Sequence, residues 1–178
     1  MKLNLGCGNK YLGNDWIHID ICKTDIVDIE MDITNLDKFE TNSINEIYVC
    51  HVFEHFRKKY INNILNEWFR VLAPNGILRI AVPDFENIAK LYVSGKYDIQ
   101  IFSGLINGGQ KNDYDIHYNI YDEKYITKLL KDTGFTDIQR YDWKDFLPEN
   151  YDDYSRAYIP HMDFENGTLV SLNICAKK

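Results

Sequence analysis

Short apolar runs recur along the chain, and each has the length expected of a buried strand. They span residues 3–5, 16–20, 44–50, 77–82, 138–143 and 169–176. The 16–20 run alternates apolar and polar residues and ends on Asp20, whereas the 77–82 run is almost continuously apolar. A continuous run of this kind is typical of a parallel strand that is buried on both faces of a sheet.

Three longer segments between these runs predict helices. Residues 53–72 place large apolar side chains on one face at helical spacing, and the Pro-Asn-Gly sequence at 74–76 ends the pattern. Residues 85–93 and 122–133 predict two further helices, the second closed by Gly134. Strands that alternate with helices predict an α/β fold with an open, mostly parallel sheet and right-handed crossovers.

Two stretches do not fit this alternation. Residues 94–121 are rich in Gly, Asn, Asp and Tyr, and residues 145–166 are acidic and aromatic. The chain has no internal repeat and no linker-like segment, so we expect one domain over residues 1–178 with both stretches as insertions. Loops placed in this way often carry function.

Composition and charge narrow the class of protein. Hydrophobic residues make up 45% of the chain and charged residues 26%, a balance typical of globular domains. The net charge of −7 and the lack of a long basic run argue against a nucleic-acid partner. Four scattered cysteines without CxxC spacing predict free thiols in a reducing compartment. No apolar stretch reaches 18 residues and no signal peptide is evident, so we expect no membrane span and a cytoplasmic location.

A glycine turn and a carboxylate point to a nucleoside-containing cofactor. Gly6 and Gly8 follow the first strand, where glycine permits backbone angles and close ligand approach that a side chain would prevent. Asp20 ends the next strand twelve residues after Gly8, and a carboxylate there can accept hydrogen bonds from ribose hydroxyls. A nicotinamide cofactor would require a third glycine where Tyr11 stands, so the pattern favours an adenosine-type cofactor of another kind.

Four motifs follow one another along the chain: LNLGCG at 3–8, WIHID at 16–20, HVFEH at 51–55 and RVLAPNG at 70–76. In this order they resemble the motifs of class I S-adenosylmethionine-dependent methyltransferases, most of all the short bacterial and viral members often associated with surface-glycan synthesis. The resemblance covers residues 3–84 most clearly. It implies a single Rossmann-like domain with a mostly parallel seven-stranded sheet flanked by helices, with the two insertions after strands 5 and 6. It also implies S-adenosylmethionine as cofactor.

The same resemblance implies which residues bind the cofactor. The methionine portion would lie against the glycine turn and His51, the ribose against the end of the second strand, and the adenine against residues 32–33. The set is Gly6, Cys7, Gly8, Asp20, Ile21, Asp32, Ile33 and His51. Family members usually have a helix before the first strand that covers the cofactor. Here the first strand starts at Lys2, so either the cofactor is more exposed, or one of the two insertions or the second subunit of a homodimer covers it.

The HVFEH segment also carries the H-x-x-E-H pattern of a family of zinc peptidases, but that pattern requires one long helix, and here it lies where a strand passes into a helix. Methyltransferases that act on small-RNA ends and on ubiquinone precursors hold a divalent metal with a similar segment. Their resemblance implies a metal site made by His51, Glu54, His55 and His117. The alternative is that no ion binds and that His51, His55 or His117 acts as a general base.

The acceptor is predicted to be a small molecule or a saccharide. Tyrosines cluster in the insertions, and their flat rings and hydroxyls suit the apolar face and polar edge of a sugar. The predicted acceptor pocket comprises Tyr114, His117, Tyr118, Tyr121 and residues 151–158. The sequence therefore predicts O-methylation of such an acceptor. The alternative is a non-catalytic domain that binds S-adenosylmethionine or serves as partner subunit of another enzyme.

Overall fold

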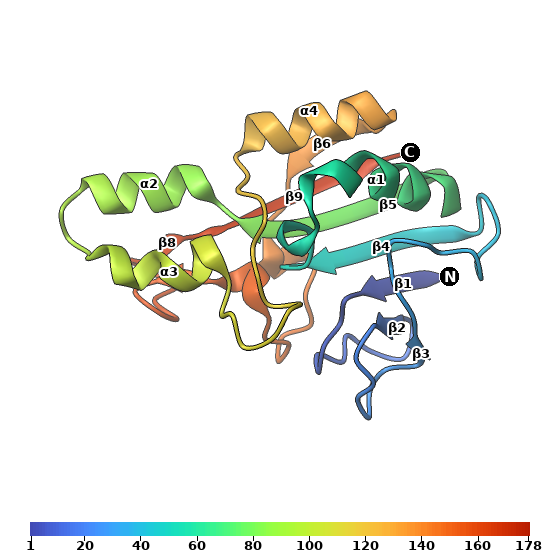
Figure 1. Ribbon diagram of the computed structural model, residues 1–178, viewed down its shortest axis with the longest axis horizontal. Helices are drawn as coiled ribbons and strands as arrows, with labels where there is room; N and C mark the ends of the chain where they lie inside the picture. The colour runs from blue at the N-terminus through green and yellow to red at the C-terminus, as the bar shows by residue number, and fades with distance from the viewer.

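A seven-stranded sheet organises the chain in the computed structural model, which describes residues 1–178 (Figure 1). The strand order is β3-β2-β1-β4-β5-β9-β6. The first five strands of this order run parallel, and β9 is antiparallel to both its neighbours. The predicted Rossmann-like, mostly parallel sheet is therefore confirmed. The strands are β1 Lys2–Leu5, β2 Ile17–Asp20, β3 Ile29–Glu30, β4 Ile44–Cys50, β5 Leu72–Pro83, β6 Thr136–Arg140 and β9 Ser171–Lys177.

Two helices cover one face of this sheet, and two others lie beyond the carboxyl ends of β4 and β5 (Figure 1). α1 (Ile61–Val71) and α4 (Glu123–Thr133) pack on the main core, to which strand residues such as Ile47 and Val49 contribute. α2 (Phe85–Val93) and α3 (Ile99–Asn107) form the projecting pair. The predicted ends of α4 are as expected: Asp122 accepts a hydrogen bond from the Tyr125 amide, and Gly134 closes the helix at φ +113°.

Around β4, the opposite face of the sheet is covered by residues of the segment between β1 and β2 and of the second insertion, in place of helices. Tyr48 alternates with Ile47 and Val49 along β4, so its side chain points to this second face. There it packs with Leu12, Trp16, Leu147 and Tyr151. The insertion contains two short 3-10 turns, η3 (Trp143–Asp145) and η4 (Tyr154–Arg156), and a two-stranded sheet of β7 (Tyr158–Ile159) and β8 (Thr168–Leu169).

Several predicted boundaries are wrong. The helix predicted over 53–72 begins at Ile61 and is preceded by two 3-10 turns, η1 (Phe53–His55) and η2 (Lys58–Tyr60), because the backbone is extended at Phe56 and Arg57. The predicted 138–143 strand ends at Arg140 as β6, and the predicted 169–176 strand is divided between β8 and β9. The sequence patterns missed β3 and α3. None of the helices combines the length and apolar character needed to span a bilayer.

Candidate active site

The glycine turn after β1 is held in a conformation that favours glycine. Gly6 and Gly8 adopt φ values of +69° and +56°. A Cβ at position 6 would come within 2.4 Å of the Val52 side chain, whereas a Cβ at position 8 would meet nothing within 4 Å. Gly6 is therefore required by close packing, and Gly8 leaves open space beside the turn.

Asp20 fixes this turn to the end of β2. Its Oδ2 accepts a hydrogen bond from the Gly8 amide at 2.8 Å, and its Oδ1 accepts one from the Cys22 amide at 2.8 Å. The side chain of Thr24 donates to the Gly8 carbonyl at 3.0 Å. The carboxylate is thus oriented by backbone groups, and its remaining lone pairs are available to a ligand.

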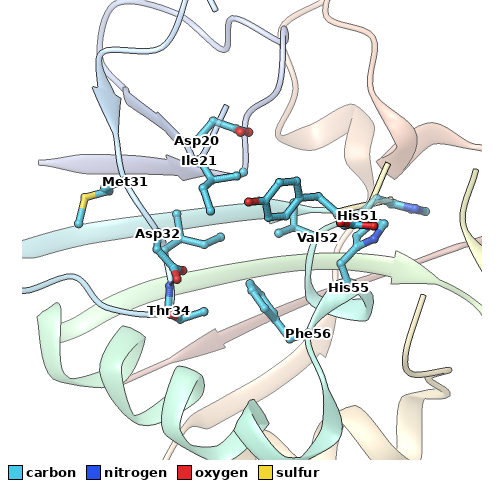
Figure 2. A pocket seen from close by; sticks show the side chains of 13 residues that line it. Asp20, Ile21, Met31, Asp32, Thr34, His51, Val52, His55 and Phe56 are labelled. Carbon is cyan, nitrogen blue, oxygen red and sulfur yellow. Dashed lines mark hydrogen bonds between the residues drawn. The ribbon is translucent and has the colours of Figure 1, made fainter. Parts of the chain in front are cut away.

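A cavity of about 370 Å³ opens at the carboxyl ends of β1, β2 and β4, the usual ligand position in an open α/β sheet. Figure 2 shows Asp20 and Asp32 on one side of it and His51 and His55 on the other. An adjoining cavity of about 180 Å³ shares Gly6 and His51 with it. Together the two cavities are lined by every residue of the predicted cofactor set: Gly6, Cys7, Gly8, Asp20, Ile21, Asp32, Ile33 and His51.

Both insertions contribute to these cavities. Asp113 and Tyr114 of the first insertion line the larger cavity, and Tyr154 of the second lines the smaller one. Tyr154 also lies close to His51, with ring centroids 5.4 Å apart. The larger cavity is lined in addition by four residues outside the predicted cofactor set: Met31, Thr34, Val52 and Phe56.

His51 has an unusual backbone conformation at the end of β4. Its φ is +51°, in the left-handed region, and its amide donates to the Ala81 carbonyl at 2.8 Å. The buried ring lies between Ser171 Oγ, 3.0 Å from Nε2, and Glu54 Oε1, 3.3 Å from Nδ1. Burial and then the neighbouring His117 and His55 lower the pKa of His51 to about 3, so the imidazole is neutral.

Glu54 is fully buried, and neither of its carboxyl oxygens has a hydrogen-bond partner. Burial raises the pKa of this carboxyl to about 8. Its backbone carbonyl accepts hydrogen bonds from the amides of Tyr118, at 2.9 Å, and Asn119, at 3.3 Å. These bonds attach the end of the first insertion to η1 and thereby place His117 beside Glu54.

His55 and His117 lie beside Glu54, and His117 Nε2 is 3.8 Å from Glu54 Oε1. His55 Nδ1 lies 3.1 Å from the Ile116 carbonyl and His117 Nδ1 3.0 Å from the Leu105 carbonyl. A carbonyl oxygen can only accept, so both Nδ1 atoms carry the proton and both Nε2 atoms present a lone pair. Burial lowers the pKa of both histidines, that of His117 to about 4.

Three of the four residues predicted to hold a metal come together here. One ligand atom from each of Glu54, His55 and His117 lies within 4.8 Å of the others. His51 does not complete this set, although its ring contacts Glu54. A histidine whose second nitrogen donates to a backbone carbonyl is the usual arrangement around a protein-bound metal. The donor set therefore fits a divalent cation.

The predicted acceptor residues are only partly brought together. Tyr121 is 1% exposed and stacks on Phe53 in the core, so its predicted place in the pocket is wrong. The pattern could not distinguish a core tyrosine from a pocket tyrosine. Tyr118 lies against the Arg57 guanidinium, and Tyr114, which is 59% exposed, lines the larger cavity.

Comparison with known proteins agrees with this geometry. Residues 3–80 match a family described as a methyltransferase domain. An Archaeoglobus fulgidus structure, described as a SAM-dependent methyltransferase, is 14% identical with a TM-score of 0.59, over 99% of this chain and 85% of that one. Residues 3–80 thus match a methyltransferase domain, and the structural likeness extends the fold of such enzymes over nearly the whole chain. No curated protein sequence matches it.

Two further structures share this class I methyltransferase fold over 99% of the chain. A SAM-dependent methyltransferase from Methanosarcina mazei is 17% identical, with a TM-score of 0.58 and 91% of its own chain covered. The 1,6-didemethyltoxoflavin-N1-methyltransferase of Burkholderia thailandensis, solved with S-adenosylhomocysteine, is 15% identical, with a TM-score of 0.59 and 70% covered. At these identities the likeness concerns the fold, and the methyl acceptor must be inferred from this chain's own residues.

Proposed function

We propose that this methyltransferase transfers a methyl group to a hydroxyl oxygen of a saccharide-type acceptor, with a divalent cation held by Glu54, His55 and His117. One observation carries the proposal: a buried carboxyl group without a hydrogen-bond partner lies with two imidazoles beside the cavity proposed for the cofactor. Buried polar atoms in native proteins almost always have a partner. A cation would satisfy all three groups.

The cofactor occupies the two adjoining cavities in this proposal. Asp20 accepts from the ribose hydroxyls with Ile21 beside it, and the adenine lies at Asp32 and Ile33. The methionine portion lies along the turn at 6–8, next to His51. Burial, and then the neighbouring Asp20, raise the pKa of the Cys7 thiol to about 12, so a neutral side chain packs against the ligand there.

Two histidine nitrogens and one carboxylate favour zinc, manganese or iron over magnesium or calcium. A cation bound there would act as a Lewis acid and lower the pKa of the acceptor hydroxyl. Glu54 and the two histidines would hold that cation, and their anchoring to backbone groups keeps them in place. The fully buried position of Glu54 strengthens its interaction with any cation.

The transfer itself needs mainly orientation. The acceptor oxygen would form a bond to the methyl carbon as the carbon–sulfur bond breaks, with S-adenosylhomocysteine as the leaving group and the hydroxyl proton released to solvent. Tyr114 and Asp113, on the same cavity as His55, would bind the acceptor. An exposed tyrosine ring beside a carboxylate suits a sugar, as in glycan synthesis. Four free cysteines are compatible with the reducing cytoplasm.

The test is release of S-adenosylhomocysteine in a screen of sugar nucleotides and glycans, with and without a chelator. We expect turnover that the chelator abolishes while calorimetric binding of S-adenosylmethionine is unchanged, because the cation serves the acceptor. His117→Ala should behave like the chelated protein. Turnover that resists the chelator would exclude the cation. Cofactor binding without turnover of any hydroxyl acceptor would favour a non-catalytic domain.

A further inference from the structure

A series of buried hydrogen bonds, the relay, leads from His51 into the last strand of the sheet. His51 Nε2 lies 3.0 Å from Ser171 Oγ, which lies 2.8 Å from Asn173 Oδ1. Asn173 Nδ2 in turn lies 2.8 Å from the backbone carbonyl of Ser155. Ser171, Asn173 and Ser155 are all at most 2% exposed, so water does not compete for these bonds.

The last member of the relay, the Ser155 carbonyl, determines which atom donates and which accepts in each of its hydrogen bonds. The Ser155 carbonyl can only accept, so the Asn173 amide nitrogen donates to it and Asn173 Oδ1 faces Ser171. The single proton of the Ser171 hydroxyl is then donated to Oδ1. Ser171 Oγ is left as an acceptor, and His51 must carry its proton on Nε2.

The far end of the relay, at Ser155, is itself held in place. Asp153 accepts hydrogen bonds from the amide and the hydroxyl of Ser155, at 2.9 and 2.6 Å, and from the Tyr48 hydroxyl, at 2.6 Å. Asp153 and Ser155 are buried, so the Ser155 carbonyl is held at one position. The second insertion thus sets the orientation of a ring at the end of β4.

We infer that Ser171 and Asn173 are positioning residues that hold the His51 proton on Nε2. The unprotonated Nδ1 then lies 3.3 Å from Glu54 Oε1. An imidazole without this constraint is free to carry its proton on Nδ1. The relay prevents this and keeps a further imidazole lone pair beside the set formed by Glu54, His55 and His117.

The role of the His51 lone pair beside the cation rests on the proposed function, but the tautomer of His51 does not. Nitrogen-15 NMR of histidine side chains in the cofactor-free protein, without added cation, measures the tautomer directly. We expect a protonated Nε2 in His51 and a protonated Nδ1 in His55 and His117; His51→Gln identifies the His51 signals. A proton on His51 Nδ1 would overturn the inference. The cation proposal would not be affected, because it is tested separately by titration of the protein with the cation.

Substitution of Asn173 tests the relay without touching His51. In Asn173→Ala the Ser171 hydroxyl loses its acceptor and can donate to His51 Nε2, so the His51 proton should move to Nδ1. Asn87→Ala is the matched control, because its amide also donates to a backbone carbonyl, that of Leu169, but lies outside the relay. A folded Asn173→Ala protein with an unchanged tautomer would contradict the assigned role.

The Ser171 hydroxyl should also matter for cation affinity. Loss of a group that orients a metal-binding site typically weakens the metal about 10–100-fold. We expect a loss in this range for Zn²⁺ in Ser171→Ala, with recovery in Ser171→Thr and unchanged S-adenosylmethionine binding in both. If Zn²⁺ binds the wild type and Ser171→Ala equally well, His51 has no part in the cation site.

Discussion

Asp20 is oriented for a ligand before the ligand arrives, because the Gly8 and Cys22 amides hold both its oxygens. We predict that Asp20→Ala weakens S-adenosylmethionine binding by about 1–3 kcal/mol, measured by calorimetry, through loss of charge-assisted hydrogen bonds to the ribose. Asp15→Ala, at an exposed carboxylate without such bonds, is the control. Unchanged affinity in Asp20→Ala would remove this residue from the cofactor site.

A second prediction at the scale of single residues concerns Gly8. A Cβ at this position meets no atom within 4 Å, so the branches of a valine would extend into the smaller cavity that Gly8 lines. Gly8→Val should fold, at a cost of about 1–2 kcal/mol for the left-handed backbone, but should not bind the cofactor. Gly95→Val carries the same kind of strain, at φ +72° and in open space, away from both cavities. Equal cofactor binding by the two variants would contradict the prediction.

Single residues were predictable from the sequence where they belong to a motif. The glycine turn, Asp20 and the HVFEH segment lie in short, ordered patterns, and the structure gathers them at one cavity. His117 depended on a resemblance, because 62 positions separate it from His55. Ser171 and Asn173 gave no signal, since two polar residues in an apolar strand do not reveal a hydrogen-bonded partner on another element.

At the scale of elements, η1 and the end of the first insertion form one unit. Besides the two backbone bonds to Glu54, the Asn119 side chain donates to the Phe56 carbonyl. We predict that Asn119→Ala loosens His117 and lowers Zn²⁺ affinity about tenfold, in the range for groups that support a metal site, while cofactor binding is unchanged. Asn63→Ala, exposed on α1, should change neither. Wild-type Zn²⁺ affinity in Asn119→Ala would show that the backbone bonds suffice.

The same unit explains why the predicted helix began too early. Residues 53–60 continue the apolar spacing of α1, so periodicity alone extends the helix back to Phe53. In the folded chain the Glu54 carbonyl is bonded to the insertion, and a helix would need that carbonyl for its own ladder. A contact from 60 residues away cannot be read from local spacing. α3 was missed because Gly104 and neighbouring Gly and Asn residues suggested a loop.

At the scale of the whole molecule, the two cavities proposed for the cofactor are lined by residues from 4–56 and from both insertions, so cofactor binding should stabilise the domain as a unit. A ligand at 100 times its dissociation constant stabilises by about 2.7 kcal/mol. For a domain of this size we predict a rise in Tm of about 5–10 °C with S-adenosylhomocysteine at that excess. Asp20→Ala at the same ligand concentration should show a smaller rise. No rise in the wild type would contradict cofactor binding.

The sheet was the part of the molecule that the sequence predicted best. Runs such as 44–50 and 77–82 are apolar because both faces of these central strands are covered, and their lengths specify strands. The cover of the second face was not predictable. Tyr151 and Leu147 pack against Tyr48 from a segment without regular periodicity, so only the folded chain shows that an insertion takes the place of helices.

The most direct test of the central claim is calorimetric titration of the cation-free protein with Zn²⁺ or Mn²⁺. We predict one ion per chain, with binding lost in Glu54→Gln and His117→Ala, because each removes one of the three converging ligands. His161→Ala, at an exposed histidine outside this cluster, should bind as the wild type does. A wild-type protein that takes up no ion, or a Glu54→Gln protein that binds equally well, would contradict the account.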